Sequence, residues 1–167
     1  VGVMDPLFES TEGNSREIFT VEYNLECVDD QDVTCTGRHY RTLRISADAG
    51  GGVLVYGIAV DGGDELTFDP PVLLGDSSAI ADEVWETETG GTTITSQFTG
   101  SEACDIRWTD QWDDCIVLEI DDGDANTGLA GTLWAVSSWG MVAFQIGADT
   151  GRWELSTASW CDGSDNC

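Results

Sequence analysis

Three oxygen-bearing side chains stand at alternate positions in one acidic turn of the sequence. Asp122, Asp124 and Asn126 are separated by single small residues. Such spacing lets a tight turn direct several oxygens to one Ca²⁺ ion, which prefers roughly six to eight oxygen ligands. Thr127 and Leu133 stand where a helical calcium loop has glycine and glutamate. The turn therefore indicates a calcium site, with a solvated hairpin turn as the alternative.

Six cysteines fall in three close pairs along the chain. The sequence has no Cys-x-x-Cys and its only histidine is His39, so a four-ligand zinc site would need cysteines from distant segments. Local disulfides fit the spacing better, and each would stabilise the fold by about 2–3 kcal/mol. Disulfides are typical of exported proteins, so we expect a secreted, extracellular or cell-surface location. The expected pairs are Cys27 with Cys35, Cys104 with Cys115, and Cys161 with Cys167.

The C-terminal segment, residues 161–167, places acidic side chains between two cysteines as Cys-Asp-Gly-Ser-Asp-Asn-Cys. It resembles the Cys-Asp-Gly-x-Asp-Asn-Asp-Cys element of metal-binding repeats in secreted bacterial proteins. The resemblance covers seven residues and lacks both the last Asp of the element and the flanking acidic repeat. It therefore carries over neither a fold nor a metal. Asp162 and Asp165 stay candidate cation ligands, with a disulfide-closed turn as the alternative.

Tryptophan is in excess, with seven copies in the chain. Alternation along residues 139–148 puts Trp139 and Met141 on one face of a strand. Along residues 152–160, Trp153 and Leu155 share one face and Trp160 lies on the other. We expect Trp139, Met141 and Trp160 to form an exposed aromatic surface that binds polysaccharide or a second subunit. The alternative is that both faces are covered within the domain.

Charge and motif content exclude several classes of protein. The sequence has no Gly-x-Ser-x-Gly, phosphate-binding loop, dinucleotide-binding glycine pattern or His-Glu-x-x-His, and we expect a protein that is not an enzyme. Its formal net charge of −26, with arginine as the only basic residue, repels phosphate backbones and excludes nucleic-acid partners. No run of about 18 apolar residues occurs, so we expect no membrane insertion.

The elements that position these groups are β-strands, because the apolar pattern has a period of two. Residues 17–27 alternate strictly, as a half-buried strand does. Residues 53–60 are apolar on both parities, which suits a central strand covered on both faces. Two β-rich arms meet at Gly90-Gly91, which predicts a hairpin, whereas Pro70-Pro71 predicts a break.

This spacing predicts an all-β fold, an antiparallel β-sandwich or jelly-roll-like domain of about nine strands pinned by local disulfides. Residues 17–167 would form this single domain. Residues 1–16 have no obvious hairpin partner, and we expect them to form an extended N-terminal arm. Its apolar side chains are Val1, Val3, Met4, Leu7 and Phe8.

The leading functional hypothesis is an exported, non-enzymatic structural protein that assembles into a filament or coat. The arm would add itself as a strand to the sheet edge of a neighbouring subunit, and head-to-tail addition of this kind does not close. Subunits of charge −26 repel one another, so assembly needs salt, bound cations or buried apolar contact. The alternative is a tryptophan-based carbohydrate-binding module with a structural calcium ion.

Overall fold

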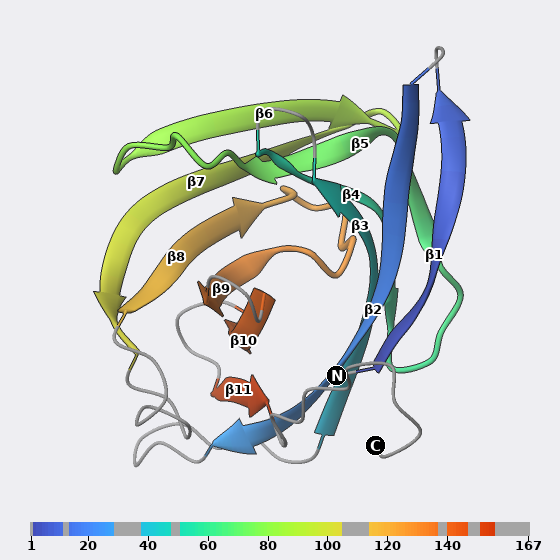
Figure 1. Ribbon diagram of the computed structural model, residues 1–167. Coiled ribbons are helices and arrows are strands. Elements are labelled where there is room, and N and C mark those ends of the chain that lie inside the picture. The colour runs from blue at the N-terminus through green and yellow to red at the C-terminus, as the bar shows by residue number, and fades with distance from the viewer. Residues whose placement is uncertain are drawn as a thin grey trace.

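A single antiparallel sheet of eleven strands contains all the strands in the part of the chain that the structure describes (Figure 1). The computed structural model describes residues 2–11, 14–28, 38–47, 51–104, 114–136, 140–146 and 151–155. These ranges contain strands and turns only, and within them no helix is long and apolar enough to span a membrane.

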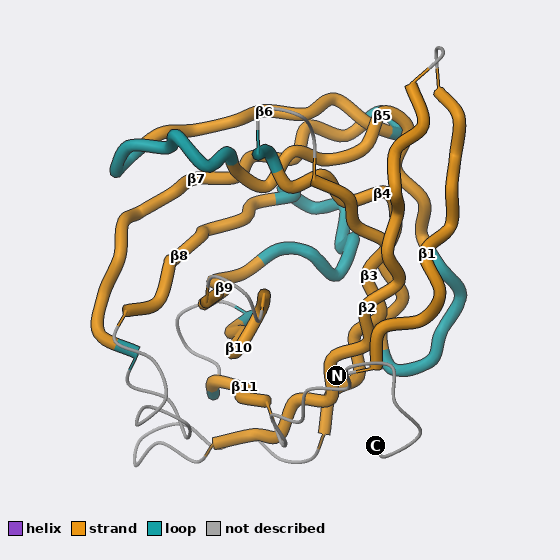
Figure 2. The backbone as a smooth tube through the Cα atoms, in the orientation of Figure 1, coloured by secondary structure: helices purple, strands orange, loops and turns teal. Residues whose placement is uncertain are grey.

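The strands follow one another around a ring (Figure 2) in the order β5-β4-β3-β2-β11-β10-β9-β8-β7-β6. β1 is off this path and pairs with the first part of β2, on the same edge of β2 that pairs further along with β11. The strands are β1 (Gly2–Thr11), β2 (Asn14–Val28), β3 (Arg38–Ala47), β4 (Val53–Val60), β5 (Leu66–Gly75), β6 (Glu83–Thr89), β7 (Thr92–Ala103), β8 (Asp114–Asp121), β9 (Gly131–Val136), β10 (Gly140–Gln145) and β11 (Arg152–Leu155).

The two ends of the sheet meet at a seam between β5 and the β6–β7 hairpin. The backbone N–H of Leu73 donates to Oγ1 of Thr87 at 3.2 Å, and the hydroxyl of Ser96 donates to the carbonyl of Leu74 at 2.6 Å. Thr87 and Ser96 are both buried. These bonds bring the sheet close to a closed barrel. The prediction of an all-β antiparallel fold is confirmed, but the nearly closed sheet of ten strands is not clearly a sandwich or jelly roll of about nine.

Strand positions follow the sequence pattern in most places. The hairpin at Gly90-Gly91 is confirmed, and both glycines have the positive φ (59° and 82°) that a two-residue hairpin turn requires. Pro70 and Pro71 do not break the chain, because they lie inside β5. Among the described strands β5 has β4 as its only ladder partner, and the pairing register shifts between Val55 and Gly57, so the missing proline N–H groups are tolerated.

The N-terminal segment has a partner within its own chain. β1 pairs antiparallel with β2, from Gly2 opposite Glu22 to Thr11 opposite Asn14. The prediction that this segment lacks a hairpin partner was therefore wrong, although β1 does lie outside the ring of ten strands (Figure 1). The arm residue Val1 and the side chains of the other apolar arm residues lie outside the described part of the structure.

Buried side chains cover both faces of the sheet at β4. Val55 and Ile58 belong to the large core inside the ring, whereas Leu54 and Tyr56 pack with Ile18 on the opposite face. The prediction that strand 53–60 is covered on both faces is therefore confirmed at these positions.

Candidate functional site

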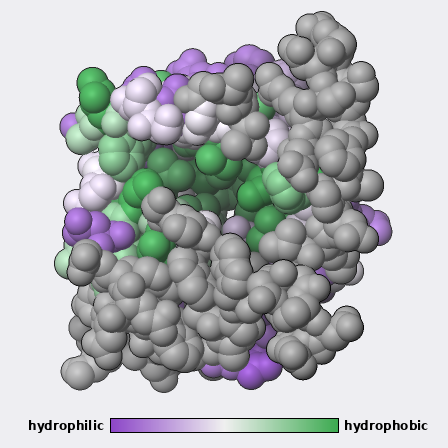
Figure 3. Space-filling view, in the orientation of Figure 1, coloured by the Kyte–Doolittle hydropathy of each residue, from purple (hydrophilic) through white to green (hydrophobic). Residues whose placement is uncertain are grey.

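The interior of the barrel is hollow at one end. A cavity of about 520 Å³ opens there, and the space-filling view shows a hydrophobic hollow in the middle of this face (Figure 3). Small-molecule sites in proteins commonly measure roughly 300–1,000 Å³, and the mouths of β-barrels are among their usual locations. The cavity is therefore the candidate functional site.

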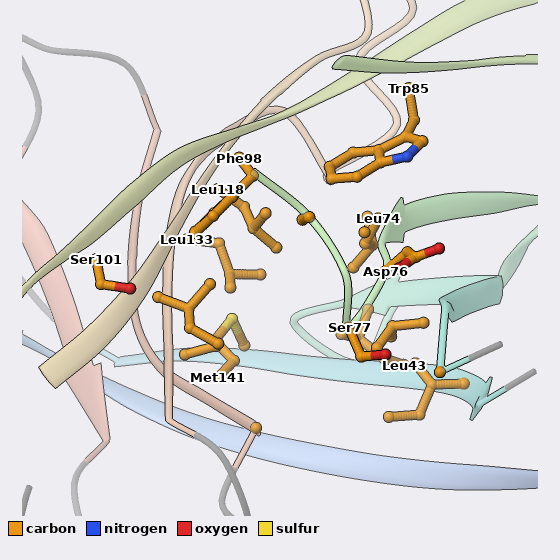
Figure 4. A pocket seen from close by; sticks show the side chains of 18 of the residues that line it. Leu43, Leu74, Asp76, Ser77, Trp85, Phe98, Ser101, Leu118, Leu133 and Met141 are labelled. Carbon is orange, nitrogen blue, oxygen red and sulfur yellow. The ribbon is translucent and has the colours of Figure 1, made fainter. Parts of the chain in front are cut away.

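Apolar side chains from the inward faces of β3 to β10 form most of the cavity wall. Strand alternation explains their placement, because every second residue of a barrel strand points inward. In Figure 4 the two sides of the cavity carry Leu43 and Leu74 on one side, Phe98, Leu118, Leu133 and Met141 on the other, and Trp85 at the top of the view.

Small residues leave the cavity unfilled between these larger ones. Gly75, at the end of β5, lies under the indole of Trp85: a Cβ atom added there would be 3.6 Å from Cζ3 of Trp85 and 3.8 Å from a methyl group of Leu118. Ala135 and Ser101 also line the cavity. Larger side chains at these inward positions would occupy the space, so the hollow is a consequence of residue size.

Polar groups are few at the cavity and lie mainly in the connection that follows β5. Asp76 and Ser77 line it there, and Ser101 lines it from β7 (Figure 4). The carboxylate of Asp76 accepts hydrogen bonds from the backbone N–H and the hydroxyl of Ser78, each at 2.6 Å. These bonds lower the pKa of Asp76, so this carboxylate is ionised at neutral pH.

Tyr23 of β2 lines the cavity from the interior side. Its side chain is buried, and this burial raises the pKa of the phenol, while a hydrogen bond with the backbone of Met141 acts in the opposite direction. Gly140 lies against the ring: its φ is +72°, and a Cβ there would come within 2.8 Å of the phenolic oxygen. Glycine at 140 is thus required both by the backbone and by the phenol.

A buried arginine fills the barrel interior beyond the cavity. Arg41 is only 3% exposed, donates a hydrogen bond to the carbonyl of Gly128, and stacks over the ring of Phe144. Burial lowers its pKa to about 10, although the charge of Asp61 acts the other way. The arginine holds the loop at Gly128 against the barrel interior and does not line the cavity.

The single histidine lies near the start of β3, close to a carboxylate. Nδ1 of His39 is 2.9 Å from Oδ2 of Asp61, and its ring meets that of Trp153 edge to face, with centroids 4.6 Å apart. Asp61 also accepts a hydrogen bond from the backbone N–H of Tyr40 at 2.9 Å. These contacts join β3 to the turn after β4 and to β11, and none of the four residues lines the cavity.

The three candidate ligands of the predicted calcium turn lie in different environments. Asp122 is buried and accepts two hydrogen bonds at 2.6 Å, from the backbone N–H and the hydroxyl of Thr127, whereas Asp124 and Asn126 are exposed. Within the described ranges no group of three or more His, Cys, Asp or Glu side chains could hold a metal ion. Asp122 closes its own loop, and calcium binding stays a prediction.

The disulfide prediction is confirmed for one pair. Cys104 and Cys115 are bonded, with Cα atoms 4.9 Å apart, and join the end of β7 to the start of β8. Cys27 is also disulfide-bonded, and its partner is not described. The other predicted positions outside the described residues are Cys35, Cys161, Cys167, Asp162, Asp165, Trp139 and Trp160.

Met141 does not belong to an exposed aromatic surface. It is 4% exposed and lines the cavity. The pairing of β10 with β9 shifts register between Met141 and Ala143, and such a bulge breaks the alternation that sequence parity assumes. Phe144 is therefore buried in the same core as Met141, although their parities differ.

Met141 was the only cavity residue that sequence reasoning had singled out, and for a different role. A usable signal existed, because Gly75 and Ala135 are small residues next to large apolar ones in the sequence. It could not be interpreted without knowing that the sheet closes. A strand pattern alone does not distinguish the inside of a barrel from one layer of a sandwich.

Comparisons of the chain with protein-family models, with curated proteins and with solved structures find no match. The feature of the protein that bears most directly on its function is the apolar cavity at the mouth of the barrel.

Proposed function

We propose that this protein binds a small, largely apolar organic molecule inside its barrel and is not an enzyme. The observation that carries the proposal is the cavity of about 520 Å³, walled by side chains such as Trp85, Leu118 and Met141 and open at one end. Burying roughly 300 Å² of apolar ligand surface there would contribute about 7 kcal/mol before the entropic cost of binding. Because the entropic cost is subtracted from this gain, we expect dissociation constants weaker than about 10 μM.

The chemistry of the lining supports binding without conversion. Asp76 is the only carboxylate among the described lining residues, and it is already engaged by Ser78. Paired acid and base groups of the kind that glycosidases use have no counterpart in that lining. The Cys104–Cys115 disulfide suits an oxidising compartment, and we infer that the protein carries its ligand outside the cell.

Binding of a neutral fluorescent probe tests this function. N-phenyl-1-naphthylamine should gain fluorescence with the native protein, because the naphthyl group enters an apolar environment. Ala135→Trp and Ser101→Trp fill the cavity from two strands and should each weaken binding at least tenfold. Val84→Trp is the matched control, since Val84 is 48% exposed and neighbours Trp85 on the outer face of β6.

Circular dichroism and thermal melts establish that each variant is folded before its binding is compared. Equal probe binding by the native protein and by both folded cavity variants would show that the barrel interior is not the site. An unchanged fluorescence spectrum of the probe with native protein would overturn the proposed function.

Self-assembly is a second candidate, and the position of β1 favours it. β1 is a ten-residue strand off the main ring, and among the described strands it pairs only with β2. An edge strand of this length can receive a strand from another copy. Deleting residues 1–11 should convert filaments or oligomers in high salt to monomers, as measured by light scattering. Unaltered assembly of the folded deletion variant would contradict this mechanism.

A further inference from the structure

The described residues that line the cavity carry negative charge only. Asp76 is the only charged residue among the described residues that line it, and the other polar side-chain groups there are the hydroxyls of Tyr23, Ser77 and Ser101 and the indole N–H of Trp85. Figure 4 places Asp76 and Ser77 together, on the same side as Leu43 and Leu74. An apolar body held in the barrel would therefore have its polar end near one carboxylate and near hydroxyls.

Four arginines have side chains that the structure describes, and all four lie elsewhere. Arg38, Arg44 and Arg152 form ion pairs with Glu26, Glu65 and Glu154 at 2.5, 2.6 and 2.7 Å. Arg41 lies deeper in the barrel, against Phe144 and Gly128. None of these arginines lines the cavity, so none stands ready to neutralise an anionic ligand.

Two physical effects favour the same ligand charge. Walls of low dielectric focus the field of a protein of net charge −26 into its cavities, which raises the local concentration of cations and lowers that of anions. Trp85 and Phe98 present aromatic rings to the same space, and aromatic faces attract cationic groups.

We propose that the barrel selects its ligand by charge: it takes apolar molecules with a neutral or positively charged polar end, such as an organic ammonium, and rejects those with a carboxylate. This inference rests on the proposed function and narrows it to a ligand class. Asp76 is the charged lining residue near which the polar end would lie, with the hydroxyl of Ser77 beside it as a hydrogen-bonding partner.

Competition among three molecules with the same ten-carbon chain tests the selection. Decylammonium, 1-decanol and decanoate are used to displace N-phenyl-1-naphthylamine from the full chain at neutral pH, below their aggregation limits, in about 20 mM salt. The displacement constant of decylammonium should be at least tenfold lower than that of decanoate, with 1-decanol between them. About 1 M NaCl should reduce the ratio severalfold, because it screens exposed charges.

A substitution at Asp76 distinguishes the effect of this carboxylate on ligand binding from the effect of the net charge of the protein. Asp76→Asn should weaken displacement by decylammonium about threefold to tenfold and leave 1-decanol unchanged. Glu86→Gln removes the same charge from an exposed position on β6 that does not line the cavity, and it should leave all three constants within about twofold of the native ones.

The possible results separate a failure of charge selection from a failure of ligand binding itself. Equal displacement by the three competitors, or tighter binding of decanoate, would overturn charge selection while the barrel remains a ligand site. If Asp76→Asn and Glu86→Gln weakened displacement by decylammonium equally, Asp76 would have no specific role in charge selection. Failure of the probe to bind the native protein at all would overturn both proposals together.

Discussion

The guanidinium carbon of Arg41 lies 3.7 Å from the centroid of the Phe144 ring, inside the barrel. The two residues belong to β3 and β10, which do not neighbour each other in the sheet. The contact therefore crosses the interior and ties two sides of the ring together. With the hydrogen bond from Arg41 to Gly128, it packs the barrel interior beyond the cavity.

Truncating Arg41 should destabilise the protein more than replacing it by an apolar chain of similar length. Arg41→Ala removes a hydrogen bond and buried packing, and we expect the free energy of unfolding to fall by about 2–4 kcal/mol. Arg41→Met keeps the packing and removes a buried charge, so its unfolding free energy should stay within about 1 kcal/mol of the native value. Urea denaturation measures both.

Arg38→Ala serves as the control for charge loss. Arg38 is exposed and pairs with Glu26 at the surface, where such pairs contribute little. If Arg38→Ala and Arg41→Ala lowered the free energy of unfolding equally, the role of Arg41 inside the barrel would be contradicted.

Tyr23 should make the protein lose stability at alkaline pH. Its folded pKa is raised above the ordinary value of 10, so its contribution is fully present below pH 10 and is lost as the pH rises through the folded pKa. Tyr23→Phe lacks this proton, and its free energy of unfolding should fall less between pH 9 and pH 11. Denaturation midpoints at the two pH values give the comparison.

Arg41 works against that trend, because its pKa is lowered to about 10 in the folded state. The unfolded chain then binds more protons above pH 10, which adds stability as the pH rises. The role of Tyr23 is therefore measured by the difference in unfolding free energy between Tyr23→Phe and the native protein at each pH. The pH dependence of either protein alone does not isolate it. Parallel pH profiles of the two proteins would contradict the role of Tyr23.

Opening the seam should loosen β5 before the rest of the sheet. Ser96→Ala leaves the carbonyl of Leu74 without its hydroxyl partner, and Thr87→Val removes the acceptor for Leu73. Each change should cost about 1–3 kcal/mol. Hydrogen exchange read by mass spectrometry should accelerate in peptides from β5, with peptides from β9 as the internal reference.

Ser78→Ala is a control that removes a hydroxyl hydrogen bond from an exposed turn next to the same strand. It should leave exchange in β5 unchanged. Uniform acceleration across all peptides of the seam variants would indicate general destabilisation and contradict a local seam.

Loss of the Cys104–Cys115 disulfide should destabilise the hairpin of β7 and β8. The two cysteines are 11 residues apart, and breaking a disulfide that closes a loop of this size should lower the free energy of unfolding by about 2–3 kcal/mol. Replacing both by alanine should also weaken probe binding, because Phe98, Ser101, Ile116 and Leu118 of this hairpin line the cavity. Denaturation midpoints and probe titration measure the two effects. An unchanged midpoint would show that the bond does not stabilise the fold.

Local patterns predicted most strands correctly. Alternation in residues 17–27 and the two-parity apolar run 53–60 correspond to β2 and β4, and Gly90-Gly91 is the turn of a hairpin. These features depend on neighbouring residues only. β5 was missed because Pro70-Pro71 is permitted at an edge next to a register shift, which no local pattern reveals.

The sequence by itself determined the all-β class, the acidic surface, the Cys104–Cys115 disulfide and the absence of common enzyme motifs, because composition and short-range spacing are sufficient for each. Tertiary structure alone decided that the sheet nearly closes and that a hollow remains inside it. Closure depends on contacts such as Ser96 with Leu74, 22 residues apart, and on a bulge that turns Met141 inward. Long-range contacts of this kind follow from how strands pack in space, and no periodicity along the chain encodes them.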